Sequence, residues 1–120
     1  MLSLSATARI YVYTEAADMR KGVNGLSGIV RSEFGSADPN DGSLFVFINR
    51  RRDRMKILHF TDGGYWLYYR ILEQGTFEPL RVTTGVKHLA MDATELSMLL
   101  SGVSLAAASR RRKRLKIEAA

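Results

Sequence analysis

Apolar residues alternate with a period of two along the middle of the chain, a pattern typical of β-strands. Residues 44–49, 54–60 and 65–71 form three such segments. An arginine-rich connector joins the first two, and residues 62–64 (DGG) supply turn chemistry before the third. The first segment is apolar on both faces, as a central strand is. The pattern therefore predicts a three-stranded antiparallel meander over residues 44–71.

Two other segments carry the spacing of three and four residues that marks an amphipathic helix. The first covers residues 19–34, with Asp18 as a suitable N-cap and Gly35 as a suitable stop. The second covers residues 93–101 and follows Asp92, which opens an Asp-x-x-Glu capping box. Two helices are therefore expected, one before the meander in the sequence and one after it.

The flanking segments complete the expected fold. Residues 8–13 (ARIYVY) predict a strand before the first helix, residues 86–91 predict another after the meander, and a short strand is expected near Phe77. We expect one α+β domain over residues 1–109, with two helices and a curled antiparallel sheet of about four or five strands. Residues 110–120 lack a core-forming pattern and are expected to be a mobile basic tail.

Composition narrows the function classes. The chain has 120 residues, the length of one domain, and no cysteine, which excludes disulfides and thiolate metal sites. Only His59 and His88 offer imidazole, and they lie far apart in the sequence. No signal peptide and no apolar run long enough to span a membrane is recognisable. We expect a cytoplasmic protein without a cofactor, a metal or a membrane partner.

The net charge of +6 is concentrated in two places. Residues 1–109 hold 12 basic and 11 acidic residues and are nearly neutral. Within them, five cations fall in seven residues: Arg50, Arg51, Arg52, Arg54 and Lys56. The tail adds a second run: Arg110, Arg111, Arg112, Lys113, Arg114 and Lys116. Cations gathered in this way repel one another, which favours a polyanionic partner that contacts both runs.

The arginine-rich connector is the stronger of the two signals, because guanidinium groups match phosphate oxygens in pairs. A turn could point Arg50, Arg51 and Arg52 outward together, and Arg54 and Lys56 would continue the patch along one face of the next strand. The alternative is a solvated hairpin tip whose charges discourage aggregation. With five cations, contact with phosphates is the favoured interpretation.

The aromatic strand that follows gives a weaker signal. Its aromatic residues at period two are more often part of a core than a platform for bases. Stacking on bases is the minority interpretation, with Trp66 as the residue to test. Arg70 is expected on the same face as Trp66, so both join the candidate DNA-binding residues.

Catalysis is not indicated. The carboxylates that could bind Mg²⁺ already have local explanations as helix caps or turn residues: Asp18, Asp62, Asp92 and Glu95. Asp53 could orient a neighbouring guanidinium, and no partner that would make it a metal ligand is visible. No phosphate-binding loop is present either, since no Gly-Lys-Ser/Thr sequence follows the glycines of the first helix.

Three segments carry a family resemblance: YTEAADMRKGVNGLSGIV, then DGSLFVFINRRRDRMKILHFTDGGYWLYYRILEQGTFEP, then TELSMLLSGV. In this order they resemble the TnpB accessory proteins of bacterial insertion sequences of the sixty-six type. The resemblance implies a role in transposition beside a separate transposase. It implies no catalytic residue at any of these positions.

The sequence thus predicts a non-catalytic accessory protein of transposition that binds the DNA backbone through the arginine turn and the tail. The rival interpretation is an interaction module that docks on the transposase, or on another accessory protein encoded by the element, without touching DNA. It would use the aromatic face or the helix bearing Leu96, Leu99 and Leu100. A third and weaker interpretation is a metal-dependent nuclease. The sequence does not indicate the oligomeric state or a preference for a DNA sequence or strand.

Overall fold

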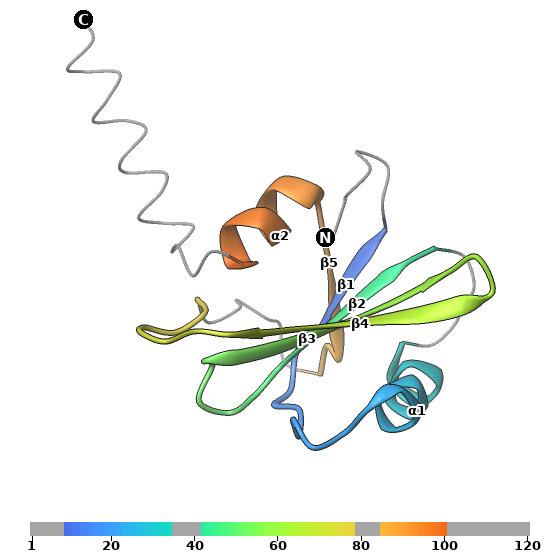
Figure 1. Ribbon diagram of the computed structural model, residues 1–120, viewed down its shortest axis with the longest axis horizontal. Helices are drawn as coiled ribbons and strands as arrows, with labels where there is room; N and C mark the ends of the chain where they lie inside the picture. The colour runs from blue at the N-terminus through green and yellow to red at the C-terminus, as the bar shows by residue number, and fades with distance from the viewer. Residues whose placement is uncertain (1–8, 35–41, 79–84, 101–120) are drawn as a thin grey trace, which may run out of the picture.

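The computed structural model describes residues 9–34, 42–78 and 85–100. Within them, five strands form one open mixed sheet in the order β4-β3-β2-β1-β5, with a helix on each face (Figure 1). The α+β class with two helices is confirmed. The elements are β1 (Ile10–Tyr13), α1 (Val23–Glu33), β2 (Leu44–Ile48), β3 (Arg54–Thr61), β4 (Gly64–Ile71), β5 (His88–Met91) and α2 (Ala93–Leu100).

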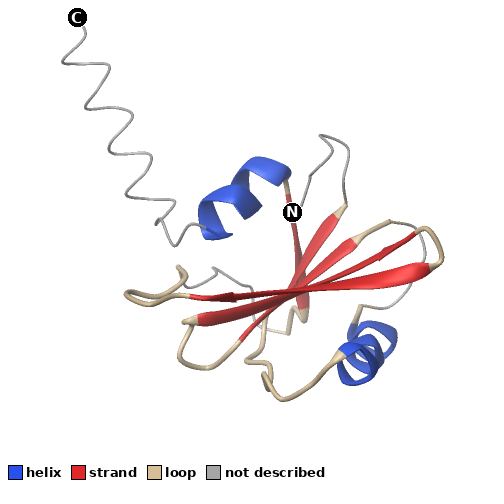
Figure 2. Cartoon of the chain, viewed as in Figure 1, coloured by secondary structure: helices blue, strands red, loops and turns tan. Residues whose placement is uncertain are grey.

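β2 is the centre of the fold and is buried along its whole length. Leu44, Val46 and Ile48 pack on one side with the buried leucines of α2. Phe45 and Phe47 pack on the other side with α1. Figure 2 shows the two helices on opposite faces of the sheet. The two-sided apolar pattern of this strand therefore requires a cover on each face.

The predicted meander is confirmed. β2 pairs antiparallel with β3. β3 pairs antiparallel with β4, in a ladder that extends to Thr61 opposite Gly64. The prediction of a wholly antiparallel sheet is wrong at β1, which runs parallel to β2 with Ile10 opposite Leu44. The connection between these two strands includes α1, and a crossover of that length returns the chain to the same end of the sheet.

The start of α1 also differs from the prediction. The helix begins at Val23, and its N-cap residue Gly22 makes no side-chain capping bond. Asp18 is not the cap, because its Oδ1 accepts the backbone N–H of Arg20 at 2.9 Å in a local turn. The predicted stop at Gly35 lies outside the described residues.

The capping box of α2 is confirmed. The backbone N–H of Glu95 donates to Asp92 Oδ1 at 2.7 Å, and the N–H of Asp92 donates to Glu95 Oε1 at 3.2 Å. Among the described residues, neither helix is long and apolar enough to cross a membrane. The expected strand near Phe77 does not form. Instead, that side chain is buried in the core beneath α2.

Asp92→Ala is expected to lower the free energy of unfolding by roughly 0.5–2 kcal/mol, because it leaves a helix N–H without its acceptor. Urea denaturation followed by circular dichroism measures the change. Thr94→Ala, at an exposed position of the same turn, is the control and should change stability by less than about 0.5 kcal/mol. Equal losses in both variants would contradict the capping role.

Candidate nucleic-acid interface

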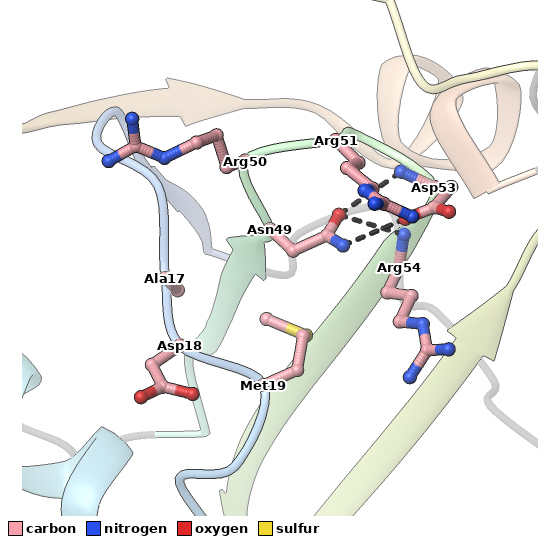
Figure 3. A pocket seen from close by; sticks show the side chains of 8 residues that line it. All are labelled: Ala17, Asp18, Met19, Asn49, Arg50, Arg51, Asp53 and Arg54. Atoms are coloured by element: carbon pink, nitrogen blue, oxygen red, sulfur yellow. Dashed lines mark hydrogen bonds between the residues drawn. The ribbon is translucent and has the colours of Figure 1, made fainter.

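Asn49 organises the connector between β2 and β3. We name this connector, residues 49–53, together with Arg54 at the start of β3, the arginine turn. Its Oδ1 accepts the backbone N–H groups of Asp53 at 3.1 Å and Arg54 at 3.0 Å. Its Nδ2 donates to Asp53 Oδ1 at 2.7 Å, as the dashed lines of Figure 3 show. Asparagine is well suited to such a turn, because its short amide can bond to nearby backbone groups. The turn is therefore held in one shape from within.

Arg52 does not point outward with its neighbours. Its backbone adopts a φ of 61°, in the left-handed region. The guanidinium Nε donates to the carbonyl oxygen of Phe77 at 3.0 Å, and Nη2 donates to that of Glu78. Partial burial lowers the pKa of this guanidinium. The prediction that Arg52 points outward together with Arg50 and Arg51 is wrong, because two of its donors bond to the backbone of the segment after β4. Contact of Arg52 with phosphate stays a prediction.

Lys56 is also a structural residue, with only 8% of its surface exposed. Its Nζ donates to the carbonyl oxygens of Met19 at 2.8 Å and Lys21 at 2.9 Å, and lies 4.9 Å from the centre of the Tyr69 ring. A buried ammonium group needs such partners to offset the loss of water. The prediction that Lys56 continues an exposed cationic patch along β3 is therefore wrong, and its contact with phosphate stays a prediction. This side chain fastens the segment before α1 to the sheet.

The other three arginines border one shallow hollow of about 360 Å³ between the turn and the segment before α1. We name it the arginine hollow. It is lined by Ala17, Asp18, Met19, Asn49, Arg50, Arg51, Asp53 and Arg54 (Figure 3). The backbone N–H of Ala17 donates to the carbonyl oxygen of Ile48 at 2.9 Å, which holds the two walls together. Arg50, Arg51 and Arg54 are exposed.

The arginine hollow is cationic. Asp18 is paired with Arg20, whose Nη2 lies 2.8 Å from Oδ2, and this contact lowers the pKa of the carboxyl to about 2. Of the two acidic residues that line the hollow, Asp53 is then the one whose charge balances those of the three arginines. Among the described residues, no ion pair joins a carboxylate to Arg50, Arg51 or Arg54.

Trp66 and Arg70 lie on the other face of the sheet. Cross-strand pairing places Arg70 beside Met55, on the side of α2, whereas Arg54 lies on the side of α1. The interpretation of the aromatic strand as core is wrong for Trp66, which is 59% exposed. Its ring stacks on Tyr68 with centroids 6.2 Å apart. Stacking of Trp66 on a base stays a prediction, and the structure does not bring Trp66 to the arginine hollow.

Arg70 has a local partner at the end of α2. Its Nε donates to the carbonyl oxygen of Leu100 at 3.1 Å, which satisfies one of the unpaired carbonyls of the last helical turn. Leu96 and Leu99 are buried against the sheet, so they do not form the docking face that the rival interpretation assigned to this helix. The predicted contacts of Arg110, Arg111, Arg112, Lys113 and Arg114 lie outside the described residues.

The comparisons with known proteins agree with the predicted resemblance. The profile of the family described as "IS66 Orf2 like protein" matches residues 8–112. The chain belongs to this family. Membership suggests an accessory role in transposition.

Two relatives from Sinorhizobium fredii are similar over most of their length. The uncharacterized protein y4jC is 36% identical over 103 residues, which is 86% of either chain. The uncharacterized protein y4hO is 32% identical over 103 residues, 86% of this chain and 87% of its own. No solved structure matches the chain.

Sequence reasoning missed the role of Asn49, although an asparagine at the start of a charged turn is a recognisable signal. It also missed the segment from Ala17 to Met19, whose place beside the turn depends on backbone bonds that no sequence pattern encodes. Within the described residues, no group of three or more histidine or acidic side chains is placed to hold a metal ion.

Arg52→Met and Lys56→Met are each expected to lower the free energy of unfolding by roughly 1–3 kcal/mol, because each leaves two carbonyl oxygens without their donor. Arg50→Met and Arg51→Met remove the same charge from exposed positions and should change stability by less than about 0.5 kcal/mol. Thermal or urea denaturation of the four variants measures the contrast. Equal stability in all four would contradict the structural assignment.

Proposed function

We propose that the protein is a non-catalytic accessory factor of transposition that binds the DNA backbone through Arg50, Arg51 and Arg54. The observation that carries the proposal is the arginine hollow. Three exposed guanidinium groups border one surface, on a turn held rigid from within, and no described carboxylate pairs with them. Like charges held together in this way gain most from an anionic ligand.

The chemistry of the three arginines favours phosphate groups as the anions that they bind. Each guanidinium offers a planar fork of donors that matches two phosphate oxygens at once. Contacts of this kind fix the position of a protein on a duplex but read no sequence. We therefore propose binding that is mostly independent of DNA sequence and strongly weakened by salt.

The basic tail is the proposed second contact. Arg110, Arg111, Arg112, Lys113 and Arg114 follow one another without an intervening acidic residue. A second group of cations on the same chain adds phosphate contacts and raises the salt dependence in proportion. Binding at two points would help to assemble the ends of the element with the transposase.

The roles of the carboxylates support a non-catalytic function. Asp18 pairs with Arg20, Asp53 accepts a bond from Asn49, and Asp92 caps α2. Each of these three carboxylates is bonded within the protein. A nuclease would instead need carboxylates that converge on a metal ion.

Arg51→Ala is expected to reduce the slope of log K against log salt concentration by about 0.9, the value for one phosphate contact on duplex DNA. The measurement is a fluorescence-anisotropy titration of a DNA duplex over a series of salt concentrations. Arg31→Ala removes an equal charge from the exposed side of α1 and should leave the slope unchanged. Truncation after Ser109 should lower the slope further, in proportion to the tail cations that touch phosphate.

Two results would contradict the proposal: binding that does not depend on salt, or equal binding by wild type, Arg51→Ala and the truncated chain. In that case the exposed aromatic residues of β4 favour the rival function, in which the protein docks on the transposase. A pull-down with the transposase after nuclease treatment at high salt tests this rival directly. A complex that survives both treatments supports contact between the proteins without DNA.

A further inference from the structure

β4 lies at one edge of the sheet and is eight residues long. The backbone N–H of Leu72 donates to the carbonyl oxygen of Asp53 at 2.8 Å, in register with the pairing of β3 and β4. Bonded and non-bonded pairs alternate along an antiparallel ladder. The outward backbone groups therefore belong to every second residue: Tyr65, Leu67, Tyr69 and Ile71. No other described strand lies beside them.

This edge also carries the exposed large apolar side chains of the described residues. Tyr65 is 54% exposed, Trp66 59%, Tyr69 45% and Ile71 50%. Natural sheets protect a free edge with charges, prolines, bulges or short strands. β4 has only Arg70 as a charge, and its guanidinium bonds to the end of α2. An edge of this kind is a surface for adding a further strand.

We propose that the added strand is β4 of a second copy of this chain, paired antiparallel about a two-fold axis at Tyr68. In this register Tyr65 faces Ile71 of the second copy, and Leu67 faces its Tyr69. Each of the four outward residues then donates one backbone hydrogen bond to the residue that it faces and accepts one from it. Moving the axis by one residue, to Leu67, leaves Ile71 beyond the paired segment.

The side chains favour the same register. With the axis at Tyr68, Trp66 faces Arg70 of the second copy in a non-bonded pair, where cross-strand side chains lie closest. A guanidinium on an indole face is a favourable cation–π pair, and the two-fold axis produces it twice. Since the sequence from Tyr65 to Ile71 complements itself in this way, a second copy fits the edge without any other partner. In this assembly Trp66 stacks on protein and not on a base.

Light scattering of the full chain tests the dimer. We expect twice the 13.4 kDa mass of one chain. Trp66→Glu should keep the dimer, because a carboxylate faces Arg70 of the second copy, whereas Trp66→Arg should dissociate it at least tenfold more readily, because two guanidinium groups would face each other. Position 66 is exposed, so both variants should fold. A monomeric wild type, or equal behaviour of the two variants, would overturn the proposal.

A cysteine placed on the axis tests the register, and the chain has no other thiol. In Tyr68→Cys the two thiols face each other in a non-bonded pair, with Cα atoms about 4.5 Å apart, within the range of a disulfide. This variant should form a covalent dimer under mild oxidation. In Trp66→Cys the thiols are offset by about 13 Å along the strands and should stay reduced. Faster cross-linking of Trp66→Cys would overturn the register.

The proposed dimer does not rest on DNA binding. If Arg51→Ala loses DNA affinity while its mass by light scattering equals that of wild type, the result bears on the arginine hollow and not on the dimer. Conversely, a monomer that binds DNA through that hollow would overturn only the dimer.

Discussion

The burial of β2 on both faces is the constraint on which the rest of the structure depends. Its residues alternate between two apolar clusters, so each face of the sheet needs a helix to exclude water. α1 and α2 are short and cover the middle of the sheet. Among the described residues, the exposed features include the arginine turn and the edge strand β4. Both proposed surfaces lie on these features.

The five cations in and beside the arginine turn have different roles, two in the fold and three on the surface. Arg52 and Lys56 each donate to two backbone carbonyl oxygens, on segments that lie on either side of the turn. Hydrogen bonds from charged donors contribute roughly 1.5–3 kcal/mol, more than a typical surface ion pair. These two residues therefore fix the walls beside which Arg50, Arg51 and Arg54 lie. Their contribution offsets part of the repulsion among the five charges.

The hydrophobic pattern predicted the meander and both helices, and the Asp-x-x-Glu spacing predicted the capping box, since each depends on residues close in sequence. The hydrophobic pattern did not predict that β1 runs parallel to β2. Apolar alternation indicates which residues of a strand face the core, but not which strand lies beside it or in which direction that strand runs. The partners of Arg52 and Lys56 were not predictable either, since a backbone carbonyl is present at every residue. The exposure of Trp66 has a similar cause. Period two places it on the α2 face, but the length and position of α2 decide which residues of that face are covered.

The two proposals reinforce each other through symmetry. Antiparallel pairing at β4 would set the arginine turns of the two copies at opposite ends of the new strand pair, because Ile71 lies next to the turn and faces Tyr65 of the second copy. One dimer would then present two equivalent cationic hollows. The slope of log K against log salt concentration is proportional to the number of phosphates contacted. A dimer that engages both hollows would therefore bind DNA with about twice the slope of one copy. Arg70 would hold the end of α2 and face the indole of Trp66 in the second copy, which would leave the phosphate contacts to the turn and the tail.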